Sequence, residues 1–362
     1  MTKKKVGLLF GGRSGEHEVS LVSAGTIAEH LSKELFEVVP IFIARSGRWY
    51  APVPMDQITT ANEEALQDRE VILAPRPGGI LLSAQTGKEV CRLDVVFPIV
   101  HGTYGEDGVT QGLLELAGVP YVGSGVAGSA VNMDKGIMRK ILAYHNIPQV
   151  DFTLVKRYDF EERQEETLKD VEAKLAYPVF VKPANGGSSV GISKAHDRDE
   201  LIHALTEAAK YDSKLLIEQG LTIREIETAV LGNVHPKASM PGEISASNEF
   251  YDYKAKYIDN KSVAQIPADL TEEQTKAVQK LALDAYEALD CEGFARVDCF
   301  LEPSTGKLYL NEINTLPGFT EISMYPKMWE AGGLSITDLL TRLVELAEER
   351  FHDRSRNSIS CD

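Results

Sequence analysis

Residues 294–314 read FARVDCFL-EPSTG-KLYLNEIN and contain the most informative pattern in the chain. Two segments rich in apolar residues, 294–301 and 307–314, flank residues 302–306, which are rich in turn-forming residue types. Such a pattern is typical of two β-strands joined by a tight connection. We therefore predict an antiparallel hairpin over residues 294–314.

The predicted hairpin gathers acidic and amide side chains on one face. Because side chains alternate between the faces of a strand, Arg296 and Asp298 share one face of the first strand. Glu312 and Asn314 share one face of the second, with Glu312 roughly opposite Asp298. Two carboxylates and an amide oxygen make a hard-oxygen site that suits Mg²⁺, and without a cation the two acids would repel each other. The alternative is a solvated polar face on which Arg296 neutralises the acids.

Two lysines and a glycine-rich loop form the second signal. Lys182 ends an apolar segment just before a proline, and Lys135 lies early in a predicted helix. The loop NGGSSVG at residues 185–191 begins three residues after Lys182. Successive backbone N–H groups in such a loop can hold phosphate oxygens, and a nearby ammonium group adds positive charge. The plainer readings are an exposed strand end and a flexible hairpin tip.

Other nucleotide and hydrolase patterns are disfavoured. Residues 187–191, GSSVG, match the GxSxG pattern of α/β-hydrolases, but that pattern needs a helix directly after the serine. The next predicted helix begins only at Asp199. The P-loop and dinucleotide-binding patterns are absent from the sequence. The sequence therefore disfavours a serine hydrolase, a P-loop NTPase and a dinucleotide-binding enzyme.

The first 120 residues predict an open parallel α/β sheet. A short apolar run at residues 6–10 ends at a glycine pair, and strand and helix signals alternate behind it. Ligands of such sheets bind beyond the carboxyl ends of the strands, where Glu16 and His101 lie. Glu16 is a candidate partner for an ammonium group, although a first-turn carboxylate favoured by the helix dipole explains it equally well. A smaller α+β unit of about 100 residues is expected to follow.

Composition limits the partners of the chain. The 38 basic and 54 acidic residues give a net charge of −16, which argues against a nucleic-acid or anionic-membrane partner. Four cysteines without metal-like spacing are too few for a disulfide framework and favour a reducing compartment. The N-terminal apolar run is shorter than the ~7–15 residues of a signal peptide, and no run approaches the ~20 residues of a membrane helix. We predict a cytoplasmic protein.

Eight segments, taken in order, resemble the ATP-grasp superfamily and, within it, the D-alanine–D-alanine ligase family. Each segment alone is weakly specific, whereas the ordered set covers nearly the whole chain. The segments are residues 11–20 (GGRSGEHEVS), 101–108 (HGTYGEDG), 133–135 (MDK), 181–183 (VKP), 187–191 (GSSVG), 250–257 (FYDYKAKY), 296–298 (RVD) and 311–318 (NEINTLPG).

The resemblance implies a three-lobed ATP-grasp fold of the α/β and α+β classes, with the open parallel sheet at its N-terminus. The expected lobes are an N-terminal α/β domain (1–122), a central lobe (123–217) and a C-terminal lobe (218–362). A mobile loop near residues 248–261 is expected to close over the site. The implied activity is ATP-dependent ligation of two D-alanine molecules to D-alanyl-D-alanine through an acyl-phosphate, for peptidoglycan precursors.

The resemblance also implies roles for individual residues. The expected catalytic residues are Glu16, Ser188, Tyr257, Arg296 and Gly318. Glu16 is expected to bind the ammonium group of the first D-alanine and to form hydrogen bonds with Ser188 and Tyr257. Arg296 and the Gly318 N–H are expected to stabilise an oxyanion. Substrate is further expected to contact His101, and Ser323 with Met324 to hold the second carboxylate. ATP is expected to contact Lys135, Lys182, Ser189, Glu218, Gln219, Leu221, Glu225 and Lys256. Two Mg²⁺ ions, which Mn²⁺ could replace, are expected on Asp298, Glu312 and Asn314.

Several alternatives remain open at this point. A D-alanine–D-lactate ligase would share these segments, although the Lys256-Tyr257 pair favours an amine acceptor. Another ATP-grasp carboxylate–amine ligase and a non-enzymatic nucleotide-binding module are the others. The resemblance allows a monovalent cation and implies a homodimer.

Overall fold

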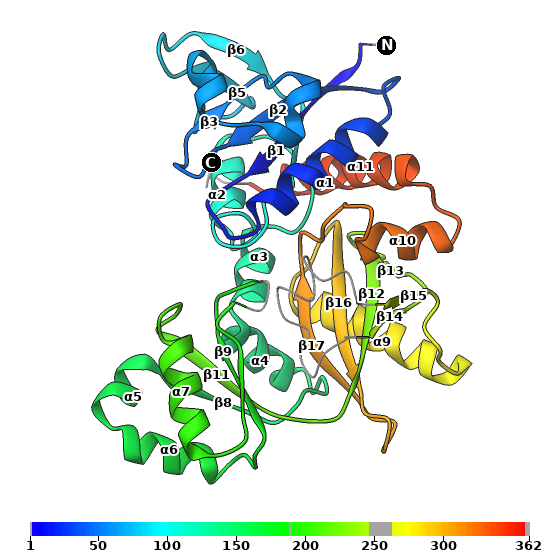
Figure 1. Cartoon of the computed structure of the whole chain (residues 1–362). Coiled ribbons are helices and arrows are strands. Elements are labelled where there is room, and N and C mark those ends of the chain that lie inside the picture. The colour runs from blue at the N-terminus through cyan, green and yellow to red at the C-terminus, as the bar shows by residue number, and fades with distance from the viewer. Residues whose placement is uncertain (1, 188–189, 246–262, 359–362) are drawn as a thin grey trace.

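The computed structural model describes residues 2–187, 190–245 and 263–358, and their strands form three sheets (Figure 1). Each sheet is accompanied by helices, and strands and helices are mixed along the chain. The predicted fold class, α/β and α+β, is confirmed. The expected mobile loop at 248–261, together with Ser188, Ser189, Lys256 and Tyr257, lies outside the described residues.

The N-terminal sheet is parallel only at its centre. Strand β1 pairs in parallel with β2 and β7, whereas the pairings from β2 to β6 are antiparallel. Short connections can join only antiparallel neighbours, so the expected parallel sheet is extended by an antiparallel edge. Its strands, in spatial order, are β6 (Glu89–Arg92), β5 (Ile80–Ser83), β4 (Glu70–Leu73), β3 (Trp49–Tyr50), β2 (Phe36–Ile43), β1 (Lys4–Gly11) and β7 (Val95–Pro98).

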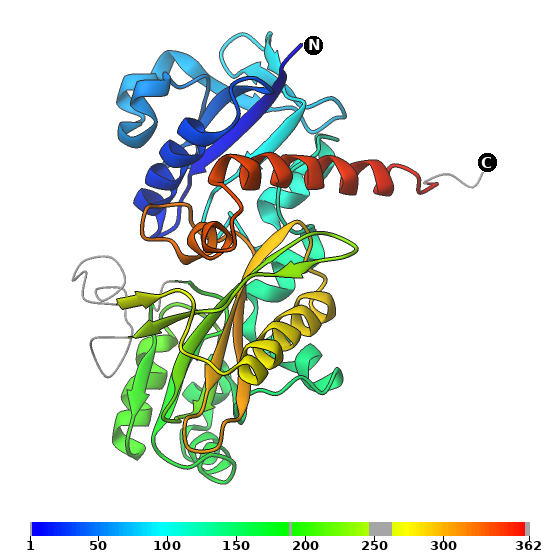
Figure 2. The same cartoon turned by 90° about the vertical axis from the view of Figure 1, so that its right-hand side faces the viewer.

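Both faces of this sheet are covered, which explains the unbroken apolar run in β1. Val6, Leu8 and Phe10 belong to one core cluster, whereas Leu9 belongs to another on the opposite face. The C-terminal helix runs beneath the N-terminal sheet (Figure 2) and contacts β7. The helices here are α1 (His17–His30), α2 (Val109–Leu116) and α11 (Ile336–Arg354), with 3₁₀ turns at Met55–Thr60 and Glu64–Arg69.

The second sheet is antiparallel throughout and small. Behind the glycine-rich loop the chain enters a strand and not a helix, so the structural context of a hydrolase serine is absent. The strands, in spatial order, are β10 (Ser193–Ala195), β9 (Val179–Pro183), β11 (Lys214–Gln219) and β8 (Phe152–Lys156). The helices are α5 (Arg157–Glu162), α6 (Gln164–Glu172) and α7 (Arg198–Ala208).

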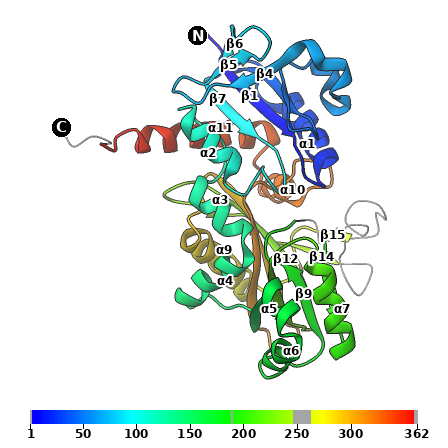
Figure 3. The same ribbon diagram turned by 90° about the vertical axis from the view of Figure 1, so that its left-hand side faces the viewer.

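Two helices, α3 (Val126–Met133) and α4 (Lys135–Tyr144), lie beside the third sheet (Figure 3). From the spacing of Met133, Ile137 and Ile141, the sequence predicts one helix after Asn132 with these residues on its apolar side. This is wrong in detail, because Met133 ends α3 and Ile137 is exposed on α4. Asp134 separates the two helices and caps α4 by accepting a hydrogen bond from the Ile137 N–H. The buried stripe is Met138 and Leu142, because these side chains pack into the core of the third sheet.

The third sheet carries the predicted hairpin as β16 and β17. Helix α9 packs against this sheet and begins at the predicted capping box of Thr271 and Gln274. The path of the sheet is β15 (Val263–Gln265), β14 (Gly242–Ser245), β12 (Arg224–Leu231), β16 (Phe294–Leu301) and β17 (Leu308–Asn314), with β13 (Lys237–Ala238) beside β12. The helices are α9 (Glu272–Ala288) and α10 (Met324–Ala331).

Aromatic packing joins the third sheet to the N-terminal sheet. The ring of Phe319 lies 6.2 Å from that of Phe97 on β7 and 6.1 Å from that of Phe294 on β16. All three residues belong to one buried cluster. The segment around Phe319 is therefore fixed between the two sheets. Among the described helices, none is long and apolar enough to span a membrane.

Candidate active site

The register of the β16–β17 hairpin confirms the arrangement expected from the sequence. Asp298 lies opposite Glu312, and Arg296 lies opposite Asn314. On its other side β16 pairs with β12, where Glu227 lies opposite Asp298. Three carboxylates therefore form a row across three adjacent strands. Like charges placed opposite each other in a sheet are destabilising, so this row needs cations.

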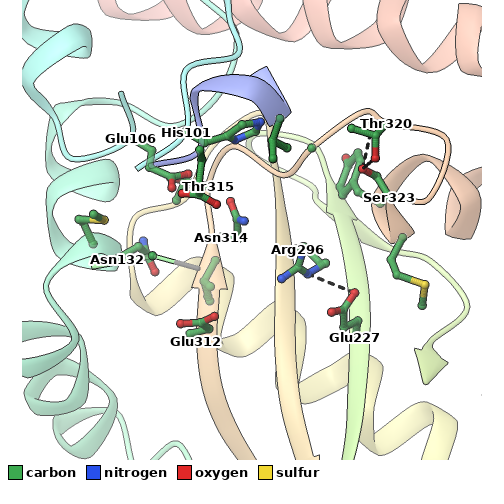
Figure 4. Close-up of a pocket in the computed structure, with 18 of the residues that line it drawn as sticks. His101, Glu106, Asn132, Glu227, Arg296, Glu312, Asn314, Thr315, Thr320 and Ser323 are labelled. Carbon is green, nitrogen blue, oxygen red and sulfur yellow. Dashed lines mark hydrogen bonds and ion pairs between the residues drawn. The ribbon is translucent and has the colours of Figure 1, made fainter. Parts of the chain in front are cut away.

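Two side chains provide positive charge to this row. The guanidinium of Arg296 holds both oxygens of Asp298, at 2.7 and 2.6 Å, and lies 3.2 Å from Glu227 (Figure 4). The ammonium of Lys135 lies 3.2 Å from Glu312. Burial opposes the charge of Arg296, but the carboxylates of Asp298 and Glu227 raise its pKa well above the ordinary value. The neutralising role of Arg296 that the sequence left open is therefore present.

A pocket opens on this face of the third sheet, and side chains from distant parts of the chain line it (Figure 4). The structure brings together there many of the residues that the sequence analysis singled out. These are Glu16, His101, Lys135, Arg296, Glu312, Asn314, Gly318, Ser323 and Met324.

Other expected residues lie outside the lining of this pocket. Gln219 uses its amide to bond the backbone of Ala176 in both directions, at 2.9 and 2.7 Å. Lys182 and Glu218 form a separate buried ion pair at 2.6 Å. The described residues that were expected at the site but do not line the pocket are Lys182, Glu218, Gln219, Leu221, Glu225 and Asp298.

The ion pair of Glu218 includes a third residue that the sequence analysis missed. Arg139 of α4 forms a salt bridge with one oxygen of Glu218, while Lys182 bonds the other. Burial acts to raise the pKa of Glu218, but the two cations outweigh it and lower the pKa to about 2. Glu218 is therefore an anion throughout the physiological range. No local pattern could have identified Arg139, since its partner lies on a strand far along the chain.

Two glycines let the backbone approach the carboxylate of Glu16. A Cβ atom at Gly102 would lie 3.1 Å from Oε2 of Glu16, and one at Gly187 would lie 2.9 Å from the same atom. Real Cβ atoms rarely or never make contacts this short. Glu16 at the start of α1 is thus in close contact with the loop after His101 and with the glycine-rich loop. The structure therefore brings these three segments together at Glu16.

Two titratable groups next to Glu16 are perturbed. His101 is buried, its Nε2 has no hydrogen-bond partner among the described residues, and burial lowers its pKa. Burial raises the pKa of Glu106 to about 8, and the charge of Glu16 adds to the shift. Perturbed groups gathered in a cleft are typical of functional sites. Glu106 was not among the expected site residues, although it lies in one of the family-like segments.

The loop after β17 brings Gly318 next to the beginning of α10. A Cβ atom at Gly318 would lie 3.0 Å from the hydroxyl of Ser323. That hydroxyl accepts a hydrogen bond from the Thr320 N–H at 2.9 Å. Ser323 is the N-cap residue of α10, and helix N-termini favour anions. This corner of the pocket is therefore suited to a carboxylate.

Comparison with known proteins identifies the family. A family model described as D-ala D-ala ligase N-terminus matches residues 5–124, and one described as D-ala D-ala ligase C-terminus matches residues 141–345. The chain belongs to the D-alanine–D-alanine ligase family. A D-alanine–D-alanine ligase of Natranaerobius thermophilus is 48% identical over 359 residues, which are 99% of this chain and 98% of that protein.

Solved structures of this family have the same fold. The D-alanine–D-alanine ligase of Coxiella burnetii is 38% identical, with a TM-score of 0.83 and coverage of 98% of both chains. The VanG D-Ala:D-Ser ligase of Enterococcus faecalis is 36% identical, with a TM-score of 0.86 and coverage of 96% of this chain and 100% of that one. The ATP-grasp fold inferred from the sequence is thereby confirmed.

Proposed function

We propose that this protein joins two D-alanine molecules to D-alanyl-D-alanine at the expense of ATP, for the synthesis of peptidoglycan precursors. One observation carries the proposal: Arg296, Glu312 and Asn314 of the hairpin line a single pocket with Glu16 and Gly318. This pocket contains a carboxylate for an amino group, a guanidinium for developing negative charge, and oxygen donors for a cation. All three are required to join a carboxylate to an amine.

The chemistry must first make a carboxylate electrophilic. Transfer of the γ-phosphoryl group of ATP to the carboxylate of the first D-alanine gives an acyl-phosphate and ADP. The amine of the second D-alanine attacks the acyl carbon and gives up a proton, and inorganic phosphate leaves as the C–O bond breaks. Water would hydrolyse the acyl-phosphate, so the pocket must be closed during the reaction. The loop at 248–261 is proposed to close it, with Tyr257 joining Ser188 and Glu16.

The residues of the pocket have distinct proposed roles. Glu16 binds the ammonium of the first D-alanine, and Arg296 with the Gly318 N–H stabilises the tetrahedral oxyanion. The beginning of α10, at Ser323 and Met324, holds the carboxylate of the second substrate. His101, which is buried and whose Nε2 has no hydrogen-bond partner in the part of the chain that the structure describes, contacts substrate.

ATP is proposed to bind between the central and C-terminal lobes. Lys135 and Lys182 contact its phosphates, and Glu218, Leu221 and Glu225 its adenosine. Ser189, Gln219 and Lys256 complete the nucleotide site. The three sheets support a division into three lobes, for which we propose the bounds 1–122, 123–217 and 218–362; strand β11 ends at Gln219, so it crosses the second boundary by two residues.

The donors of the hairpin are oxygen ligands of the kind that a magnesium site needs, and in this structure both oxygens of Asp298 are bonded by Arg296, which a bound ion would have to replace there. Asp298 and Glu312 are opposite each other, and Asn314 adds an amide oxygen; such oxygen ligands suit Mg²⁺. When bound, two Mg²⁺ ions, which Mn²⁺ can replace, neutralise charge on the phosphate oxygens. We also propose a homodimer in the cytoplasm, with a monovalent cation as an accessory ion.

ADP release and product analysis test this function. With Mg²⁺ and ATP, D-alanine should stimulate ADP release and yield D-alanyl-D-alanine, whereas L-alanine should do neither. Hydroxylamine should trap the acyl-phosphate as a hydroxamate. Absence of both ADP and dipeptide with D-alanine would overturn the proposal, and equal rates with L-alanine would assign the protein to another ATP-grasp reaction.

The identity of the second substrate, which accepts the acyl group of the first D-alanine, is the part of the specificity that still has to be tested. Because the VanG structure, titled a D-Ala:D-Ser ligase, matches this chain closely in fold, D-serine is the second candidate. D-lactate is the third. Competition of D-alanine with each acceptor, read by mass spectrometry, distinguishes them. We expect the D-alanine product to dominate.

A further inference from the structure

One face of helix α4 connects the second and third sheets. Lys135 and Arg139 are four residues apart, so they lie on the same side of the helix. Lys135 pairs with Glu312 on β17. Arg139 pairs with Glu218 on β11 and donates a hydrogen bond to the carbonyl of Leu310 on β17, at 2.8 Å. Arg139 thus bridges the two sheets between which ATP is proposed to bind.

Arg139 is unusually buried for a charged side chain. Only 1% of it is exposed, and Glu218 is 3% exposed. The backbone carbonyl of Arg139, in the middle of α4, accepts a hydrogen bond from the side chain of Gln149 at 2.9 Å, which helps to fix the helix at this point. A buried ion pair is held in one geometry by such contacts, because breaking it leaves an uncompensated charge. The side chain therefore has a defined position.

The cluster of Arg139, Lys182 and Glu218 has an excess of positive charge. Its two cations face one carboxylate, and the salt bridges of the described residues add no second carboxylate. Without Arg139, Lys182 and Glu218 would neutralise each other. With Arg139, the cluster keeps one net positive charge in a region of low dielectric, where it acts strongly on an anion.

We propose that Arg139 is a positioning residue for the nucleotide: it neutralises Glu218, so that the charge of Lys182 is available to the polyphosphate of ATP. This inference rests on the proposed function, which supplies ATP as the substrate. Arg139 itself touches no phosphate in this scheme. It acts through Glu218 and Lys182, and through Leu310 it holds β17 at a fixed position relative to β11.

The test compares the affinity for ATP with the affinity for adenosine, both measured by calorimetry without D-alanine. Arg139→Met should lower the ratio of ATP affinity to adenosine affinity about tenfold. The lost charge acts on the phosphates, whereas any change at Glu218, a proposed adenosine contact, affects both ligands alike and leaves the ratio unchanged. Arg139→Lys keeps the charge and should recover most of the ATP affinity. In the double variant Arg139→Met/Glu218→Gln, the ratio of ATP affinity to adenosine affinity should return toward the value of the parent protein, because the carboxylate that would neutralise Lys182 is absent.

Arg350→Met is the matched control. Arg350 is also a buried arginine, but it bonds the backbone of Tyr121 and Gly123, away from this cluster. Its loss should lower the melting temperature and leave the ratio of ATP to adenosine affinity unchanged. The same ratio in Arg350→Met and Arg139→Met would overturn the inference, as would equal binding by Arg139→Met and Arg139→Lys.

The two proposals can fail separately. If the parent protein binds ATP but forms no dipeptide, the proposed function is wrong and the inference is still measured by the affinity ratio. If it forms dipeptide and Arg139→Met keeps the parent ratio, the inference alone is wrong. Should Arg139→Met be unfolded, Arg139→Gln replaces it, because the amide of glutamine can still donate a hydrogen bond while the charge is lost. The ratio of ATP affinity to adenosine affinity should then fall as expected for Arg139→Met, and the parent ratio would overturn the inference.

Discussion

The hydroxyl of Ser23 on α1 accepts a hydrogen bond from the backbone N–H of Phe319 at 3.1 Å, across 296 residues of sequence. Ser23 is fully buried. The bond therefore ties the first helix of the chain to the loop that carries Gly318. The position of the proposed oxyanion donor is set partly by the N-terminal sheet, and not only by the lobe to which it belongs.

Ser23→Ala should reduce both kcat and stability. Without the hydroxyl the buried Phe319 N–H loses its partner, which costs about 1–3 kcal/mol, and the Gly318 N–H shifts relative to the reacting carbon. We expect kcat to fall about tenfold, with the KM for ATP unchanged, because ATP is proposed to bind elsewhere. Steady-state kinetics and thermal unfolding measure both effects. A variant with parent kcat and lowered stability would show that the bond is structural only.

Arg296→Ala should nearly abolish ligation. Removing one oxyanion donor typically costs about 10²–10³ in kcat, and here it also leaves Asp298 and Glu227 without their main cation. Arg198→Ala is the matched control, because Arg198 holds Glu172 in a similar two-point contact, at 3.1 and 2.7 Å, far from the pocket. The control should turn over at the parent rate. Parent-like turnover by Arg296→Ala would refute the site.

Glu312→Gln should weaken the use of Mg²⁺. The substitution removes one of two facing carboxylates and one anionic ligand. We expect the Mg²⁺ concentration for half-maximal activity to rise about 10–100-fold, by analogy with other losses at metal sites. EDTA should stop the parent reaction, and added Mg²⁺ or Mn²⁺ should restore it. Glu172→Gln, the partner of the control arginine, should leave the Mg²⁺ requirement unchanged.

The hairpin illustrates what the sequence can predict. The β16–β17 register follows from alternation and one short turn, so Asp298 and Glu312 could be expected opposite each other from local sequence. Glu227 joins them only because β12 pairs with β16, a contact between distant segments. No local pattern contains that pairing, and the same holds for Arg139 and Glu218.

Two predictions that the structure contradicts, the apolar stripe of α4 and the fully parallel N-terminal sheet, also failed because they depend on contacts between distant segments. On α4, an apolar stripe that includes Ile137 and one that includes Met138 are shifted by one residue, so both are compatible with the local sequence. Packing against the third sheet decides that the stripe with Met138 is buried. Likewise, a buried apolar strand can have the same sequence pattern in a parallel and in an antiparallel sheet. The antiparallel edge from β3 to β6 could therefore not be predicted from the pattern. Local sequence predicted the elements, whereas tertiary pairing decided their partners.

Because of Glu106, we expect the folded protein to become less stable as the pH rises toward alkaline values. Burial raises the pKa of the Glu106 carboxyl to about 8 in the folded chain, from the ordinary value of 4.5 that applies when the chain is unfolded. Between these values the folded state binds more protons, so stability falls as pH rises from about 4.5 to about 8. Glu106→Gln keeps an acceptor for the Gly102 N–H, which the parent carboxylate bonds at 2.8 Å. The melting temperature of the variant should exceed that of the parent at pH 8.5 and vary less with pH, and a parallel pH profile would contradict this.

Gly187→Ala should disturb the first D-alanine through Glu16. The new Cβ would lie 2.9 Å from Oε2 of Glu16, so the carboxylate or the loop must move. A displacement of ~1 Å at a positioned group can cost about 10² in rate, and we expect kcat/KM for the first D-alanine to fall by a factor of this order. Gly186→Ala is a close control, because, of the residues that the structure describes, its Cβ would meet only Pro183, at an ordinary 3.8 Å. If Glu16 binds the substrate ammonium, Gly187→Ala and Gly186→Ala should differ sharply in kcat/KM for D-alanine and hardly at all in ATP affinity. Equal effects of the two substitutions on D-alanine kinetics would mean that a change in the loop, and not a displaced Glu16 carboxylate, causes the loss of activity.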